Sequence, residues 1–208
     1  MVYLRCVLNA DGNAGTELSR RLGSAREEFC NLQRIWNHSS ISRSRKLEVY
    51  NACVVSKLTY NLHSLWLNKN EQGKIDALHV RCLRKVLKIA PSYYSRVSNQ
   101  TVLQQAGARS ISNQLLERQL LFLGDLARRE NSDILKQSVL DTSTQGFAPK
   151  ANTGHRRRGR PKTTWSKGVF AQAVKVAAHS SQDIGYLMMN SPAARTKWSQ
   201  VVRKYCNE

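Results

Sequence analysis

The side chains that could perform chemistry are scattered along this sequence rather than grouped. Nucleotidyl transfer or hydrolysis with two metal ions needs carboxylates clustered around divalent cations. The six aspartates occur singly, and no Asp-Asp pair is present. Glycine-rich loops of the P-loop or dinucleotide-binding type, which hold phosphates, are also missing. We therefore expect a chain that is not an enzyme by itself, with no catalytic residues, no cofactor and no small-molecule substrate.

Histidine and cysteine give one weak candidate for a metal site. His79 and Cys82 lie three residues apart, so on a helix they would share a face. A zinc site needs further ligands, and no second pair has comparable spacing. We interpret Cys82 as a core residue and His79 as a residue near the surface, and we expect no metal. Five widely spaced cysteines form neither a disulfide framework nor a Cys-x-x-Cys site, which favours a reducing, intracellular compartment.

The strongest chemical signal is positive charge. The chain has 33 Lys and Arg against 14 Asp and Glu, a formal net charge of +19. No acidic residue lies between Asp76 and Glu117, or between Asp141 and Asp183. Such a chain attracts polyanions, and nucleic acid is the partner we favour. A charge excess that only solubilises the chain and an anionic membrane surface are the alternatives, and no apolar run is long enough to span a membrane.

The densest basic cluster lies in a segment rich in glycine and proline. Its cationic residues are Arg156, Arg157, Arg158, Arg160 and Lys162. An extended Arg158-Gly159-Arg160-Pro161 segment can enter a narrow A·T minor groove, and it matches the core of an AT-hook. The alternative is a solvated basic linker that contacts phosphates without sequence preference. We expect this arm to be extended and mobile without ligand.

Apolar spacing predicts the elements that would position these residues. A short strand is expected at 2–8, followed by turn residues. Apolar stripes at helical spacing then predict helices at about 16–36, 42–66, 71–89, 101–106, 110–126, 165–176 and 192–205. Thr16, Ser42 and Ser110 are expected helix caps, and Pro91 and Gly107 are expected stops. The four tryptophans fall at helical spacing and are expected in the core rather than as base-stacking platforms.

These elements predict an all-α chain. We divide it into an orphan strand and turn at 1–14, a helical domain at 15–140, a basic flexible linker at 141–162 and a small C-terminal helical unit at 163–208. The strand is expected to fray, to form a small hairpin or to lie over the helices, because an isolated strand exposes unpaired backbone groups.

An ordered series of motifs links this chain to a known family. The first motifs are Tyr3-Leu4, Asp11-Gly12, Glu17-Leu18-x-Arg20-Arg21-Leu22 and Ala25-x-x-x-Phe29-x-x-Leu32-x-x-x-Trp36. The series continues with Ser42-x-x-x-Lys46-Leu47-x-x-Tyr50-x-x-x-Val54-Val55-Ser56-x-Leu58-x-Tyr60, Leu78-His79-x-Arg81-Cys82-Leu83-Arg84-x-Val86-Leu87-x-Ile89 and Ser95-Arg96-Val97-Ser98-Asn99. It ends with Gly159-Arg160-Pro161-Lys162-Thr163-Thr164-Trp165 and Arg195-x-x-Trp198. Together they resemble the thumb and post-thumb region of non-LTR (LINE-type) retrotransposon reverse transcriptases.

The resemblance covers nearly the whole chain and implies a function. In that family the thumb grips a template-primer duplex beside the catalytic palm, whose paired aspartates this chain lacks. Two features depart from the family: Arg5 stands where it usually has Gly, and the zinc knuckle of many members is unmatched.

The resemblance therefore implies a non-catalytic, intracellular and nuclear fragment that binds RNA or DNA through backbone phosphates, with the missing palm as a further partner. The thumb residues expected to bind are Arg81, Arg84, Lys85, Lys88 and Arg96. The arm residues Arg156, Arg157, Arg158, Arg160 and Lys162 would add to them. A stand-alone AT-hook-like chromatin protein and a non-functional retroelement remnant are the alternatives.

Overall fold

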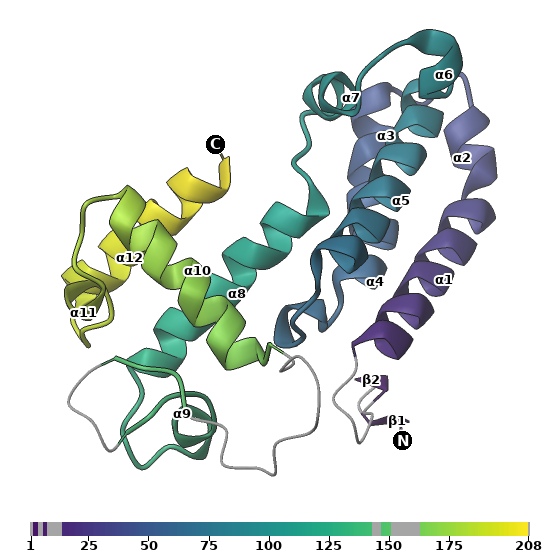
Figure 1. Cartoon of the computed structure of the whole chain (residues 1–208). Coiled ribbons are helices and arrows are strands. Elements are labelled where there is room, and N and C mark those ends of the chain that lie inside the picture. Colours follow the sequence, from purple (N-terminus) through teal and green to yellow (C-terminus); the bar gives the residue numbers. More distant parts are fainter. Residues whose placement is uncertain (1, 4–5, 8–13, 143–146, 151–162, 208) are drawn as a thin grey trace. The chain divides into compact units, whose positions relative to one another are not determined.

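The computed structural model is mostly helical, as the sequence predicts (Figure 1). It describes residues 2–3, 6–7, 14–142, 147–150 and 163–207. The chain forms two compact units, Met1–Leu115 and Leu116–Glu208. The boundary lies inside helix α8 (Ile111–Ala127), whereas we expected one helical domain to continue to residue 140.

The first unit begins with a small hairpin. Strands β1 (Val2–Tyr3) and β2 (Cys6–Val7) are antiparallel, with Val2 opposite Val7 and Tyr3 opposite Cys6. A hairpin is one of the three outcomes expected for an orphan strand. The elements that follow are α1 (Gly15–Asn31), α2 (Gln33–Asn37), α3 (Arg43–Val49), the π-helix η1 (Tyr50–Val55), α4 (Ser56–Thr59), the 3-10 helix η2 (Leu62–Ser64), α5 (Lys69–Leu87), α6 (Ser92–Ser95) and α7 (Asn99–Ala106).

Two of the helices predicted for this unit are interrupted. The predicted helix at 16–36 breaks at Leu32 into α1 and α2, and the Nε1 of Trp36 donates to the carbonyl of Phe29 across the break. The predicted helix at 42–66 contains the π-helix η1 and ends at Thr59. Thr16 is not the cap of α1, because the cap position is Ala14 and no side chain bonds there.

Several predicted caps and stops are confirmed. Ser42 caps α3 by accepting a hydrogen bond from the backbone N–H of Arg45. The Oγ of Ser110 accepts from the N–H of Asn113 at the start of α8. Gly107 ends α7 in the left-handed conformation, with φ of 58°, which glycine adopts without steric cost. The helix before Pro91 ends at Leu87.

An aromatic cluster fills the core of the first unit. Phe29 stacks on Trp36 with ring centroids 5.1 Å apart, and Tyr50 meets both rings edge-on. The Tyr50 hydroxyl lies 2.8 Å from Nδ1 of His79, whose side chain is only 1% exposed. Our expectation of His79 near the surface is therefore wrong. Its position on the α5 face that carries the buried Ile75 and Cys82 places it in the core.

The second unit contains the rest of α8 with α9 (Ile134–Val139), α10 (Trp165–His179), α11 (Ile184–Leu187) and α12 (Pro192–Asn207). The short helices α9 and α11 were not predicted. Trp198 is buried, and its Nε1 donates to the carbonyl of Leu120 at 3.0 Å. At Gly124 a Cβ atom would meet the Trp198 indole at 2.5 Å, so the two helices approach more closely than alanine would allow.

The predicted linker at 141–162 is described in part. Residues 147–150 are described, and Leu140 and Pro149 form an isolated antiparallel bridge. Residues 143–146 and 151–162 lie outside the described part of the chain. No helix among the described residues combines the length and apolar character needed to cross a membrane.

Candidate nucleic-acid interface

One face of α5 carries a row of cations, which we call the basic ridge. It consists of Lys74, Arg81, Lys85 and Lys88. Spacings of seven and four residues place Lys74, Arg81 and Lys85 on one face of α5, and Lys88 is the left-handed C-cap residue directly after the helix. All four are exposed. Ile75, Leu78, Cys82 and Val86 on the adjoining side of α5 are buried and hold the helix in the core.

Glu71 and Asp76 lie close to Lys74 in the sequence, but no carboxylate occurs between Asp76 and Glu117, so the ridge from Arg81 onward has no acidic residue near it in the sequence. Within the part of the chain that the structure describes, none of its four cations forms a salt bridge. By contrast, Arg45 pairs with Glu48, and Arg195 pairs with Asp125. The charge of the ridge is therefore available to an external anion.

The pKa of the buried Cys82 thiol is influenced by two cations of the basic ridge. Burial raises the pKa of the Cys82 thiol to about 11, while the nearby charges of Lys85 and Arg81 act in the opposite direction. The thiol is therefore protonated at neutral pH and unreactive. Among the described residues, no group of three or more His, Cys, Asp or Glu side chains is placed to hold a metal ion.

Arg84 does not lie on the surface where we expected it. Its side chain is buried at 8% exposure, and its guanidinium donates to the carbonyls of Ala90 and Val97 at 3.1 and 2.7 Å and to Oδ1 of Asn99 at 3.1 Å. These bonds fasten the segment from Ala90 to Asn99 onto the end of α5. Arg84 is thus a positioning residue rather than a phosphate ligand.

Residues 88–98, which we call the α6 loop, contain most of that segment and present Arg96 and two tyrosines. Arg96 is exposed and has a left-handed backbone, with φ of 56°. Tyr93 and Tyr94 are 65% and 73% exposed, and their ring centroids lie 4.2 Å apart. Sequence reasoning missed these rings. Their signal was two adjacent aromatic residues shortly after Pro91, outside any apolar stripe.

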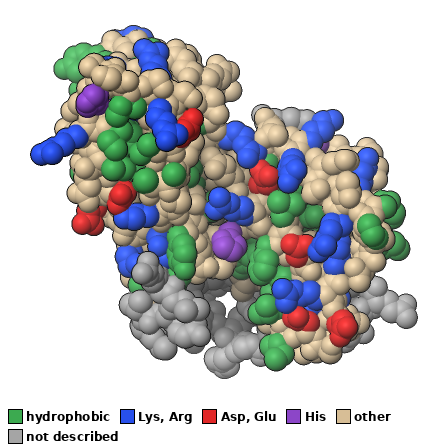
Figure 2. Space-filling model, turned by 180° about the vertical axis from the view of Figure 1, so that it is seen from behind, with side chains coloured by type: hydrophobic (Ala, Val, Ile, Leu, Met, Phe, Trp, Pro, Cys, Tyr) green, Lys and Arg blue, Asp and Glu red, His purple; other side chains and the backbone are tan. Residues whose placement is uncertain are grey.

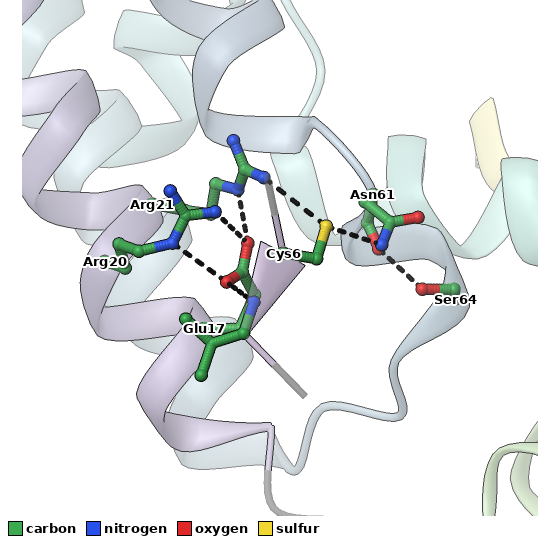
Figure 3. Close-up of polar contacts among 7 residues, drawn as sticks. Cys6, Glu17, Arg20, Arg21, Asn61 and Ser64 are labelled. Atoms are coloured by element: carbon green, nitrogen blue, oxygen red, sulfur yellow. Dashed lines mark hydrogen bonds and ion pairs between the residues drawn. The ribbon is translucent and has the colours of Figure 1, made fainter. Parts of the chain in front are cut away.

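The Glu17-Leu18-x-Arg20-Arg21-Leu22 motif holds the N-terminal hairpin in place (Figure 3). Glu17 is buried on α1 and accepts hydrogen bonds from the guanidinium groups of Arg20 and Arg21 and from the backbone N–H of Val7. Burial alone would raise the pKa of Glu17, but the bonds from Arg20, Val7 and Arg21 outweigh it and lower the pKa. The sulfur of Cys6 accepts from Asn61 at 2.8 Å, which ties β2 to the turn after α4.

A cavity of about 480 Å³ lies beside this cluster, between α1 and α4. It is lined by Arg20, Arg21, Ser24, Glu27, Ser56, Lys57 and Tyr60. Arg20 and Arg21 share the carboxylate of Glu17, Lys57 pairs with Glu28, and Glu27 also lines the cavity. Three carboxylates thus offset its three cations. It is a poorer anion site than the basic ridge.

The arm residues Arg156, Arg157, Arg158, Arg160 and Lys162 lie outside the described residues. The structure therefore describes only the expected binding residues of α5 and the α6 loop. On the face of the molecule drawn in Figure 2, Lys and Arg side chains outnumber Asp and Glu. Comparison with protein-family models, curated proteins and solved structures found no match to this chain.

Proposed function

We propose that this chain binds nucleic acid through backbone phosphates and acts as the non-catalytic thumb and post-thumb part of a non-LTR retrotransposon reverse transcriptase. The binding proposal depends on the basic ridge, where three exposed cations on one face of α5, together with Lys88 at its C-cap, form no salt bridge among the described residues. The reverse transcriptase assignment depends on the ordered sequence motifs. A nuclear location belongs to the same proposal, because such an element acts on nuclear DNA.

The spacing of the basic ridge suits a phosphate backbone. The α-helix rises about 1.5 Å per residue, so the α5 part of the ridge, from Lys74 to Lys85, extends over about 16 Å. Phosphates follow one another along a strand of duplex, and contacts to them position a protein without reading bases. Binding by the ridge should therefore be strongly salt-dependent and nearly indifferent to sequence.

The test measures affinity for a blunt-ended duplex over a range of salt concentrations. A ridge variant replaces Lys74, Arg81, Lys85 and Lys88 by Gln. Because each released counterion contributes about 0.9 to the slope of log K against log salt, the variant should lower the magnitude of that slope by about three to four. Its helicity should be unchanged, since all four side chains are exposed.

A matched control removes the same charge from cations that already have carboxylate partners. These are Arg45, Lys57, Arg129 and Arg195. The control should change the slope by less than about one, because their charge is already compensated. A wild-type slope near zero, or equal effects of the two variants, would contradict the proposed phosphate interface.

The arm supplies a second candidate function. Arg158-Gly159-Arg160-Pro161 matches the core of an AT-hook, which would make the chain a stand-alone chromatin-associated protein. That function requires tighter binding to A·T-rich than to G·C-rich duplex and competition by minor-groove ligands. Equal affinity for the two duplexes would remove it.

A further inference from the structure

Tyr93 and Tyr94 form an exposed aromatic surface on the α6 loop. Their exposures of 65% and 73% are high for large aromatic side chains, which proteins usually bury. The ring centroids are 4.2 Å apart, with planes inclined by 40°, so the rings contact each other and form one platform. Neither ring contributes to the buried core of the first unit.

Hydrogen bonds hold the loop that carries the two tyrosines in a fixed conformation. Arg84 donates to the carbonyls of Ala90 and Val97, which flank the two tyrosines on either side. The Ser95 hydroxyl also donates to the carbonyl of Ala90 at 3.0 Å, which adds a hydrogen bond inside the same segment. The loop is therefore held by side chains at both ends, and little conformational entropy would be lost when a ligand contacts the rings.

The charged residues on either side of the two tyrosines in the sequence are both cations. Lys88 precedes the tyrosines and Arg96 follows them, and both are exposed with left-handed backbones at the two bends of the loop. Lys88 is also the last cation of the basic ridge, so a strand that follows the ridge arrives at the α6 loop. No acidic residue is present in the loop.

We propose that the Tyr93–Tyr94 platform stacks an unpaired base, so that the first unit recognises the junction between a duplex and a single-stranded segment. This inference deepens the proposed function and depends on it, because the ridge must first hold the phosphates. Aromatic rings accept any base, since every base presents a π-face, whereas cations alone do not distinguish paired from unpaired strands. The ligand class is therefore nucleic acid with an unpaired end or gap, without preference for a particular base.

The experiment compares three fluorescent probes at one salt concentration: a blunt duplex, the same duplex with a thymidine overhang, and the overhang strand alone. Replacing Tyr93 and Tyr94 together by Ala should weaken binding to the two probes with unpaired bases by about 5- to 150-fold for a single stacked base. Affinity for the blunt duplex should stay within about twofold. A fluorescent purine analogue in the overhang should be quenched by the wild type and not by the variant.

Three further variants separate stacking from other effects. Replacing both tyrosines by Phe should retain binding, whereas replacing both by Leu, which keeps apolar bulk without a π-face, should behave like Ala. Tyr186→Ala is the matched control, because Tyr186 is an exposed tyrosine of α11 at 42% exposure. It should leave all three affinities unchanged.

The outcomes distinguish this inference from the proposed function. Salt-dependent binding of the blunt duplex, together with unaltered overhang binding by the Ala variant, would overturn the platform and leave the proposed function standing. Equal losses for blunt and overhang probes would also overturn it. A wild-type protein that binds none of the three probes would overturn both.

Discussion

Arginine side chains of the first unit have two different roles. Arg21 and Arg84 are buried, and their guanidinium groups are engaged by Glu17 or by the backbone carbonyls of the α6 loop. Arg81 and Arg96 are exposed, and the structure gives neither a carboxylate partner among the described residues. A buried arginine stripped of its acceptors costs about 3–5 kcal/mol, so the first pair stabilises the fold and only the second pair is available to a ligand.

This distinction could not be predicted from the sequence. Arg84 lies three residues after Arg81 and four before Lys88, so helical spacing places it beside them on the same side of α5. The α6 loop folds over Arg84 and covers it, and a contact between a helix and a later loop leaves no periodic signal. Arg81, Lys85 and Lys88 were expected on the surface and are exposed, whereas Lys74 was not among the residues expected to bind.

His79 predicts how stability should depend on pH. Burial lowers the pKa of His79 from 6.5 to about 4, although Asp76 and the backbone of Arg109 act in the opposite direction. Between these two values the unfolded chain binds a proton that the folded chain does not. The contribution of His79 to stability is therefore present above about pH 6.5 and is lost as the pH falls toward 4, by about 3 kcal/mol in all.

Chemical denaturation of the wild type and of His79→Gln measures this contribution. Glutamine can still bond to the Tyr50 hydroxyl but does not titrate. The difference in unfolding free energy between the two proteins should shrink by about 2–3 kcal/mol between pH 7 and about pH 4.5. A constant difference across this range would mean that His79 titrates normally and is not held in the core. Glu17 makes its own contribution to acid sensitivity, which is equal in both proteins and cancels.

At the scale of elements, close approach of α8 and α12 depends on one glycine. The Trp198 indole lies over Gly124, donates to the Leu120 carbonyl and is almost fully buried. Arg195, one turn earlier on α12, pairs with Asp125. The Arg195-x-x-Trp198 motif therefore joins α12 to α8 inside the second unit, and this use of the motif was not apparent from its sequence.

Gly124→Ala should destabilise the second unit. The added Cβ would approach the Trp198 indole to 2.5 Å, and a buried indole cannot move aside without disturbing the core. We expect a net loss of about 1–3 kcal/mol, even though alanine favours helix more than glycine does. Thermal or chemical denaturation followed by circular dichroism measures the change.

Gly73→Ala is the matched control at an exposed position in the second turn of α5, where nothing lies within 4 Å of the added Cβ. It should stabilise the chain by about 0.5–1 kcal/mol through helix propensity alone. If both substitutions were stabilising, the close packing of α8 against α12 would be incorrect.

The positions of the helices were largely predictable, whereas their interruptions were not. Apolar stripes and the caps Ser42 and Ser110 placed most long helices within a few residues. The break at Leu32 and the π-helix at 50–55 continue the same apolar spacing, so periodicity cannot detect them. Both flank the aromatic cluster around Tyr50, where packing of large rings decides the backbone path. The short helices α9 and α11 have too few residues to show a period.

For the whole molecule, the excess of positive charge is shared between regions with different geometry. The basic ridge lies on a helix anchored in the core of the first unit, so its cations are held at fixed spacing. The cations of the arm belong to a Gly- and Pro-containing segment outside the described residues. If the two regions bind phosphates independently, their contributions to log K should add, as effects at distant sites generally do.

The arm can be tested by replacing Arg157, Arg158 and Arg160 by Ala. We expect weaker binding to DNA and RNA and a salt slope that is shallower by about three, because three phosphate contacts are lost. The control variant removes the same charge from exposed lysines of the second unit: Lys167, Lys175 and Lys197. This control should change the salt slope less than the arm variant does.

Combining the arm and ridge variants should lower the slope by the sum of the separate decreases, while helicity and thermal stability stay at the wild-type values. A smaller combined effect would mean that both regions contact the same phosphates. Loss of helicity in the arm variant with unaltered affinity would show instead that the arm is a structural element packed on the helices. In that case the ridge alone would have to account for the salt dependence.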